Sequence, residues 1–497
     1  MSRFIRKVKT ASGATAVQVV TKQGRSVAAI DHIGSARNAT ELEFLLAIAK
    51  KHLRGGQLSL DIFEDENAEI FTEAAFSELL YDVLADQYHQ LGFGRIGDEV
   101  FEQLVLARII EPTSKLDTIR VLHDLGLDAP TNSTIHRALR RSIDKDYRDT
   151  ISRCCFEKAS KGSLSLLLYD VTTLYFEIQK EDDYRKPGLS KERRLDPQIT
   201  LGLLVGRDGF PLEVQSFEGN RTEVKTIVEV LDAFKARHNL KDITVTADAA
   251  MLSSANIGAL EELGYHYIIG SRLAKTPYEI VEYMADPRAA LFDGQIFESS
   301  MSLNTGKGTP RIKRRVIYQY RSKRAALDLR NIDKALAKAQ NMIEGKAEFK
   351  RNRFLKVTGS RREINHKLVD EARRKAGIKG YVTDLDIPPL EVIDAYHQLF
   401  QVERSFRMSK SDLKARPIFH HQRDSIEAHL TIVFAALAIA RRIQASTDLS
   451  IKKFIQKLSI VRSASISVNG SSHKISPRIS KETAEILEQL GSRGCGY

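Results

Sequence analysis

The chain contains 497 residues, of which 42% are hydrophobic and 28% are charged, and its formal net charge is +12. This length exceeds the ~100–200 residues of one domain and the composition is that of a folded protein, so we expect several domains and exclude a largely disordered chain. The longest apolar stretch, within 430–440, is shorter than the ~20 residues that span a bilayer. The three cysteines exclude a disulfide framework, and the basic first residues lack the apolar run of a secretory signal, so we expect a cytoplasmic protein.

The positive charge is concentrated in one segment. Residues 301–380 contain 23 Lys and Arg against 7 Asp and Glu, a local charge of +16, so the rest of the chain sums to −4. A basic surface of this kind favours a polyanionic partner, above all nucleic acid. The alternative is that the segment is a solvated linker. In a protein without a polyanionic partner, however, the positive charge is more usually spread along the whole chain.

Two regions are predicted before residue 160. Residues 1–62 contain alternating stretches at 16–20 and 27–30, which indicate strands of a small sheet, and then a helix over 42–53. Residues 63–160 have apolar residues three and four apart, which predicts a helical domain. A basic helix within it makes this the expected DNA-binding domain.

Within the helical region, 116–125 and 134–143 suit a helix-turn-helix motif whose second helix enters the major groove. The second helix is basic, and the arginines predicted to contact DNA are Arg137, Arg140 and Arg141. A plain helical hairpin with a solvated arginine face is an equal alternative.

The pattern then changes to α/β. The near-continuous apolar run at 164–169 predicts a strand buried on both faces. Further strands are predicted over 199–205, 210–217, 243–247 and 265–269, with helices over 222–234 and 253–263. A three-strand meander followed by alternating helices and strands is the order expected of a ribonuclease-H-like mixed sheet, here over 161–271.

The alternation stops at residue 272 and resumes with a strand at 381–383. The segment 272–379 carries the basic excess and is predicted to be an inserted α+β domain beside the active site. Within it, Phe349 and Phe354 lie among Lys and Arg residues, a mixture suited to DNA.

The last part of the chain completes the α/β domain. Residues 380–445 are predicted to form its second part, with helices over 389–408 and 424–443. Residues 446–497 are expected to form a peripheral tail.

Two aspartates stand out by their positions. Asp170 is predicted to end the first buried strand and Asp248 to end another. A carboxylate at such a place must be solvated, paired or metal-bound, because an isolated buried charge is costly. A cap for the following turn would explain either residue alone, but two of them on neighbouring strands favour a metal site.

A third acidic residue, Glu403, lies on a predicted helix. It follows Tyr396 by seven residues and precedes Lys410 by seven, so on a continuous helix the three share one face. The alternative is a surface Glu403 paired with Arg407, four residues on.

The order and context of these residues resemble the DDE transposases of bacterial insertion sequences, specifically the group with an inserted domain before the catalytic Glu. That group carries a signature of Tyr, two residues, Arg, three residues, Glu, six residues and Lys. The chain matches this signature at Tyr396, Glu403 and Lys410 and departs from it at Leu399, where the Arg would stand. Arg407 is the residue that could take over the role of that Arg.

Two further blocks are similar to the same group. One begins at Gly188, before the second predicted strand, and the other is Gly219-Asn220, after the third. The resemblance covers roughly residues 160–445.

The resemblance implies a catalytic and metal-binding set of three carboxylates: Asp170, Asp248 and Glu403. It also implies that Tyr396 and Lys410 contact DNA phosphate near the cut. Two Mg²⁺ ions, for which Mn²⁺ can substitute, would activate the nucleophile and stabilise the leaving oxygen. Mg²⁺ takes oxygen ligands, so no His or Cys is needed. His420, His421 and His429 are accordingly interpreted as helix-flanking or core residues.

These features together predict a transposase that binds the terminal inverted repeats of its own element, cleaves them and joins them to target DNA. The expected partners are DNA and, when DNA ends are paired, a second copy of the chain. No membrane association is expected, and the protein is expected to associate with the nucleoid. Two alternatives remain at this point: a ribonuclease-H-fold nuclease without strand transfer, and a non-catalytic DNA-binding regulator derived from a transposase.

Overall fold

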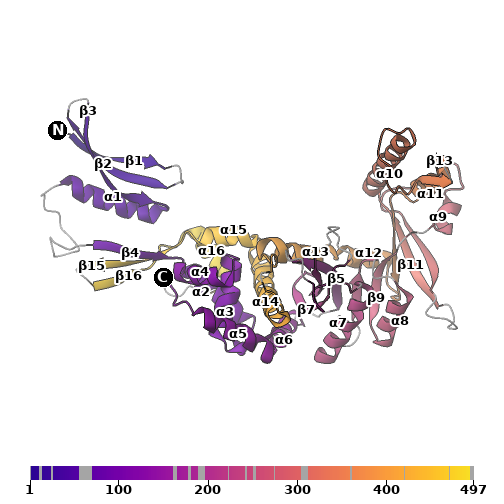
Figure 1. The fold of residues 1–497 in the computed structure, drawn as a ribbon, viewed down its shortest axis with the longest axis horizontal. Coiled ribbons are helices and arrows are strands. Elements are labelled where there is room, and N and C mark those ends of the chain that lie inside the picture. The colour runs from indigo at the N-terminus through magenta and orange to yellow at the C-terminus, as the bar shows by residue number, and fades with distance from the viewer. Residues whose placement is uncertain are drawn as a thin grey trace. The chain divides into compact units, whose positions relative to one another are not determined.

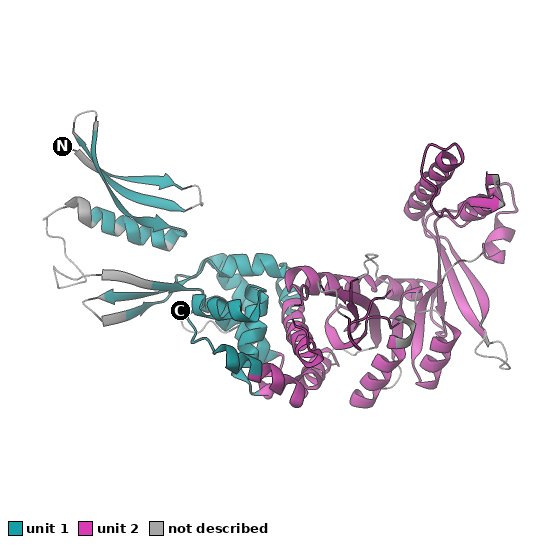
Figure 2. Ribbon diagram, viewed as in Figure 1, with its two compact units in different colours: residues 1–90, 97–136, 442–497 teal, residues 91–96, 137–441 magenta. Residues whose placement is uncertain are grey.

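The computed structural model describes residues 2–10, 14–23, 26–54, 70–160, 165–176, 181–188, 196–221, 223–240, 243–249, 253–271, 273, 275–303, 312–358, 361–418, 420–468 and 471–492. The chain divides into two compact units (Figure 2). The first comprises residues 1–90, 97–136 and 442–497, and the second comprises residues 91–96 and 137–441. No helix among the described residues has the length and apolar character needed to cross a bilayer.

The first unit begins with a three-stranded antiparallel sheet covered on one face by a helix (Figure 1). Its elements are β1 (Ser2–Lys9), β2 (Thr15–Gln23), β3 (Ser26–Ala36) and α1 (Ala39–Arg54). The core between them is formed by Val17, Val19 and Ala49. The predictions for β2, β3 and α1 are confirmed. β1 was not predicted, because its Arg and Lys residues interrupt the apolar alternation.

A run of helices follows: α2 (Glu78–Gln90), η1 (Phe93–Ile96), α3 (Glu99–Ile110), α4 (Lys115–Asp124), α5 (Asn132–Asp144) and α6 (Tyr147–Ser160). The two helices predicted for the helix-turn-helix motif are therefore present as α4 and α5. Ser114 caps α4 by accepting a hydrogen bond from the backbone N–H of Asp117 at 3.1 Å. Gly126, at φ +80°, takes the left-handed conformation that ends the turn after α4.

The C-terminal residues are a folded part of the first unit. They form α15 (Ile451–Leu458), β15 (Ser463–Val468), β16 (Ser471–Ile475) and α16 (Lys481–Gln489). β15 pairs with β4 (Ile70–Phe76), which lies hundreds of residues earlier in the chain. The helical prediction is thus wrong for 70–76, and the peripheral tail is wrong for most of 446–497, because a strand whose partner is so distant leaves no local signal.

The second unit is built on an eight-stranded mixed sheet of order β10-β11-β14-β9-β8-β5-β6-β7. The strands before the insertion are β5 (Leu166–Tyr175), β6 (Gln198–Gly206), β7 (Pro211–Glu218), β8 (Thr244–Ala247) and β9 (His266–Ser271). β5, β6 and β7 form an antiparallel meander, and β8 and β9 continue the sheet parallel to β5. This is the meander-then-alternation order predicted from the sequence.

Helices cover both faces of this sheet (Figure 1). One face carries α7 (Glu223–His238) and α8 (Ser254–Glu262), and the other carries α12 (Pro389–His397) and α13 (Phe400–Arg407). The hydroxyl of Tyr169 on β5 donates to Thr226 of α7 at 2.8 Å, which fixes the face to which each β5 side chain points. Successive strand residues alternate between faces, so Asp170 points to the α12–α13 face.

The inserted segment is divided between the sheet and a small subdomain. Its elements are α9 (Tyr278–Tyr283), β10 (Ile296–Leu303), β11 (Ile312–Tyr320), α10 (Ser322–Ile343), β12 (Leu355–Thr358), β13 (Arg361–Ile364) and α11 (His366–Arg374). β10 and β11 extend the central sheet beyond β14 (Ile378–Thr383). The core of the subdomain is Ile332, Phe354 and Val369. Phe354 is 1% exposed, so the prediction that it is presented to DNA is wrong.

The helix predicted over 389–408 is broken in two. Between α12 and α13 the backbone bonds shorten to three-residue spacing, with Leu399 N–H donating to Tyr396 at 3.0 Å and Gln401 N–H to Gln398 at 2.8 Å. Tyr396, Glu403 and Lys410 therefore do not lie on one continuous helical face. A π-helical turn, η3 (Met408–Asp412), follows α13, and α14 (Arg423–Thr447) contains the predicted buried helix.

Candidate active site

The central feature of the site is a pair of aspartates on neighbouring parallel strands. The pairing of β5 with β8 ends at Tyr169 opposite Ala247, so Asp170 and Asp248 are the next residues on the two strands. Adjacent strands lie about 4.8 Å apart and residues in register point to the same face. Both carboxylates therefore lie side by side on the α12–α13 face. β5 continues to Tyr175, so the prediction that Asp170 ends its strand is wrong, although it does end the parallel pairing with β8.

Tyr396 of α12 holds Asp248 in place. Its hydroxyl donates to Oδ1 of Asp248 at 3.2 Å, and the backbone N–H of Ala249 donates to the same oxygen at 2.6 Å. Tyr396 is only 4% exposed, and burial raises the pKa of its phenol, with the Asp248 carboxylate acting in the same direction. The hydroxyl thus stays protonated and remains a donor.

A glycine on β9 makes this contact possible. A Cβ atom at Gly270 would lie 2.6 Å from the Tyr396 hydroxyl and 3.1 Å from the Ala249 nitrogen. Real Cβ atoms do not approach a polar atom so closely, so any larger residue would displace the phenol. The sequence carries one signal of this contact, since a lone glycine within an apolar strand marks a close approach of two segments.

Lys379 of β14 is a site residue that the sequence did not reveal. Its ammonium nitrogen lies 4.2 Å from the ring centroid of Tyr396. Burial lowers the pKa of Lys379 and the nearby Arg324 acts in the same direction, while Asp248 and Glu403 oppose them. One half-buried cation therefore lies within the electrostatic reach of both predicted catalytic carboxylates.

Glu403 lies on α13, which packs against β5 and β6 on the same face of the sheet as the two aspartates. Its side chain is exposed. Among the residues that the structure describes, no group of three or more His, Cys, Asp and Glu side chains is arranged to hold a metal ion. The structure thus brings Asp170 and Asp248 together and places Glu403 across the same face, and the three-carboxylate metal site stays a prediction. Carboxylate oxygens are the ligands that Mg²⁺ prefers, so the donor chemistry of the aspartate pair fits that ion.

The other residues of the predicted signature lie near the end of α13. Arg407 is exposed, Lys410 is half-buried in the π-helical turn, and Leu399 is 8% exposed. The position where the signature has Arg is therefore an apolar packing position in this chain. DNA contacts by Arg407 and Lys410 stay predictions.

The blocks at Gly188 and Gly219 meet where β6 begins and β7 ends. A Cβ atom at Gly219 would collide with the backbone oxygens of Gln198 and Lys186, and one at Gly188 would collide with the backbone oxygen of Gly219. The two glycines thus allow the loop before β6 to lie directly on the end of β7.

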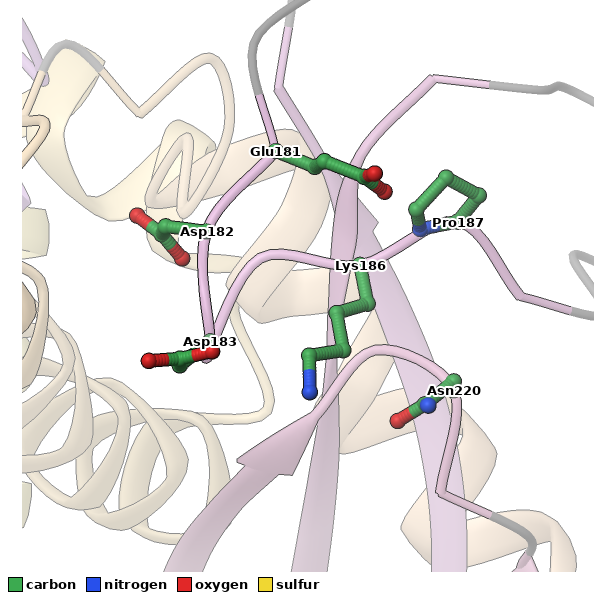
Figure 3. Close-up of a pocket in the computed structure, with 6 residues that line it drawn as sticks. All are labelled: Glu181, Asp182, Asp183, Lys186, Pro187 and Asn220. Carbon is green, nitrogen blue, oxygen red and sulfur yellow. The ribbon is translucent and has the colours of Figure 1, made fainter.

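Beside this contact is a polar pocket of about 380 Å³ (Figure 3). Its lining residues are Glu181, Asp182, Asp183, Lys186, Pro187 and Asn220. Lys186 lies between Asp183 and Asn220, and the loop is anchored by Tyr184, whose hydroxyl donates to Glu427 of α14 at 2.8 Å.

We expect Gly219→Ala to destabilise the second unit by several kcal/mol, because the new methyl group meets rigid backbone oxygens rather than a side chain that can move. Thermal unfolding followed by circular dichroism measures the change. Gly258→Ala, whose Cβ would have no atom within 4 Å, is the matched control and should leave the melting temperature unchanged or higher. Equal melting temperatures for the Gly219 variant and the native chain would contradict this account.

The arginine face of α5 is exposed, as a recognition helix requires. The helix is buried through Ile135, Ala138 and Leu139. Arg137 and Arg140 are exposed and Arg141 is half-buried, and Arg140 forms an ion pair with Asp144 at 3.7 Å. The structure therefore retains both the recognition helix and the solvated hairpin as interpretations.

Replacing Arg137, Arg140 and Arg141 together by Ala separates these two interpretations. We expect loss of sequence-specific DNA binding with little change in stability, since Arg137 and Arg140 are exposed, Arg141 is half-buried, and exposed substitutions typically change the free energy of unfolding by about 0.5 kcal/mol or less. Competition between specific and random duplexes in a mobility-shift assay measures the effect. Lys452→Ala with Lys453→Ala on α15 is the control for loss of exposed charge. Retained specificity in the triple variant would identify α5 as a solvated face.

The geometry thus defines an α/β protein with paired carboxylates at the edge of a parallel ladder. Residues 162–439 match the family described as the transposase DDE domain. This match covers more than half of the chain, so the chain belongs to that family of transposases.

Two solved structures align with the chain at low similarity. The piggyBac transposase synaptic complex with hairpin DNA has 10% identity over 83% of this chain and 74% of that one, with a TM-score of 0.36. The Mos1 transposase paired-end complex with the left transposon end has 13% identity over 47% of this chain and 67% of that one, with a TM-score of 0.16. Both scores are too low to support a conclusion. No curated protein matches the sequence.

Proposed function

We propose that the chain is the transposase of a bacterial insertion sequence, which binds the terminal inverted repeats of its element, cleaves them and transfers the ends to target DNA. The observation that supports this proposal is the register of β5 and β8, whose parallel pairing ends at Tyr169 opposite Ala247, directly before Asp170 and Asp248. Membership of the transposase DDE domain family supports it. The partners are DNA ends, target DNA and a second copy of the chain on paired ends.

In this proposal Asp170, Asp248 and Glu403 hold two Mg²⁺ ions, which Mn²⁺ can replace. Bound metal would polarise the phosphodiester and lower the pKa of the attacking water. The chain's own residues prepare the site before metal and DNA arrive. The Tyr396 hydroxyl and the Ala249 N–H both donate to Oδ1 of Asp248. These two bonds fix the orientation of the carboxylate group and therefore the direction of its other oxygen.

The test is a cleavage assay on duplex DNA containing the ends of the element, with and without Mg²⁺. Metal-dependent nicking at the element end separates an enzyme from a DNA-binding regulator. Appearance of joined products from a free 3′-hydroxyl end separates a transposase from a nuclease. Binding of the ends without metal-dependent nicking would overturn the proposal.

A further inference from the structure

The three-stranded sheet at the start of the chain has one covered face and one exposed face. The covered face packs on α1 through Val17 and Val19 (Figure 1). Residues of the other parity point away from α1, since side chains alternate along a strand. On that outer face Phe4 is 38% exposed and Ile30 is 47% exposed, so it presents large side chains to solvent.

The outer face also carries an ordered set of polar groups. Arg6 donates from Nε and Nη2 to the side-chain oxygen of Gln18, at 3.2 and 2.8 Å, across the β1–β2 pair. On the next row the Lys22 ammonium nitrogen lies 5.4 Å from the ring centroid of Phe4. Arg, Gln and Lys are the side chains that reach base edges and phosphates, and the Arg6–Gln18 pairing holds two of them in fixed orientation.

The charge of this region is strongly positive. Residues 1–37 contain seven Lys and Arg and a single acidic residue, Asp31. Outside 301–380 the chain as a whole sums to −4, so this is a second basic region, distinct from the insertion. A second copy of the same face would bring like charges together, whereas DNA would neutralise them.

We propose that the outer face of the β1–β2–β3 sheet is a second DNA-binding surface, with Arg6, Gln18 and Lys22 directed at duplex DNA. The strands of a three-stranded sheet span about 10 Å, which fits against the ~12 Å major groove. The exposed Phe4 and Ile30 supply apolar contact of the kind that thymine methyl groups accept. The chain then holds DNA through this sheet in addition to any contact by α5.

The experiment compares two double substitutions that remove the same charge from opposite faces of the sheet. Arg6→Ala with Lys22→Ala removes the outer cations, and Lys7→Ala with Lys9→Ala removes two cations whose register places them on the α1 side. Each is made in the full-length chain carrying Asp248→Asn, without metal. The probe is labelled duplex DNA of randomised sequence, and anisotropy is recorded over a series of salt concentrations.

The outer pair is expected to reduce the slope of log affinity against log salt by about 1.8, two phosphate contacts at ~0.9 each, and to weaken binding roughly tenfold. The Lys7–Lys9 pair should leave the slope unchanged. Equal effects of the two pairs of substitutions would show that DNA is attracted by the net positive charge of the region rather than by the outer face, and would overturn the proposal. Unchanged DNA binding combined with altered self-association in size-exclusion chromatography would assign the face to a protein contact instead.

A second measurement does not depend on the stability of those variants. Photoreactive benzoylphenylalanine at Phe4 is expected to crosslink to the DNA probe, and the same group at Lys7 is not. Equal crosslinking from both positions, or none from Phe4, would overturn the proposal. Cleavage is not a readout in either experiment, so the result is independent of whether the chain catalyses transposition.

Discussion

Asp170→Asn and Asp248→Asn are each expected to reduce metal-dependent cleavage of element-end DNA to background while leaving binding of that DNA intact. Each residue directly follows the β5–β8 pairing and is one of the three carboxylates proposed to hold the metal, so either amide removes one of the three negative charges offered to divalent cations. The two like charges also repel each other, so each Asn variant should unfold at the same or a higher temperature than the native chain. Cleavage and end binding are measured on the same protein preparation.

The matched control is Glu391→Gln, which neutralises an exposed carboxylate in the first turn of α12. It should retain cleavage. Normal cleavage by either aspartate variant would show that the pair is not the metal site and would remove the observation on which the proposed function stands. Loss of both cleavage and binding would instead indicate a folding defect, which the unfolding temperature detects.

The sequence predicted the strands of the catalytic sheet well because their signal is local. The nearly continuous apolar runs in β5 before Asp170 and in β6 identify buried strands without reference to any partner. Their meander-then-parallel order then follows from the lengths of the connections. The position of Asp248 directly after β8 was correct for the same reason.

Features that depend on distant partners were not predicted. β4 pairs with β15, and nothing near residue 70 indicates a strand whose partner begins at Ser463. β10 and β11 join the central sheet through β14, although the insertion reads as a separate domain. The break after α12 was missed because Leu399 is helical in propensity and conformation, and only the spacing of the backbone bonds changes there.

The site was predicted in part for a related reason. Residue type and strand position identify a carboxylate, whereas the groups that orient it come from other elements. Lys379 and Gly270 lie on strands of the same sheet as β8 and meet Tyr396 only in the folded chain. Tyr396 itself was predicted from a family signature as a DNA contact, and the structure adds a hydrogen bond to Asp248 that the signature does not contain.

That hydrogen bond leads to the second large expected effect. Tyr396→Phe removes the hydroxyl that orients Asp248, and loss of a group that positions a metal ligand typically costs about 10–100-fold in activity. Gly270→Ala should cost a similar factor, because its methyl group would occupy the space 2.6 Å from that hydroxyl. Because Tyr396 is only 4% exposed and its hydroxyl is bonded to Asp248, both variants should bind element-end DNA normally, which is the opposite of what the signature implies for a phosphate contact by Tyr396. Cleavage rates at several Mg²⁺ concentrations measure the loss, and Gly258→Ala, in open space on α8, is the control for adding a methyl group.

The double variant distinguishes positioning of Asp248 from two unrelated defects. If the methyl group of Gly270→Ala acts by displacing the Tyr396 hydroxyl, a chain that already carries Tyr396→Phe loses little more when Gly270 is replaced. The new Cβ then meets ring carbon Cζ at 3.2 Å and the Ala249 nitrogen at 3.1 Å, and the 2.6 Å contact with oxygen is gone. The two substitutions should therefore be strongly non-additive, with the Tyr396→Phe/Gly270→Ala chain close in cleavage rate to Tyr396→Phe alone. Multiplying losses would show instead that Gly270 and Tyr396 act separately, and that the phenol is not what holds Asp248 for catalysis.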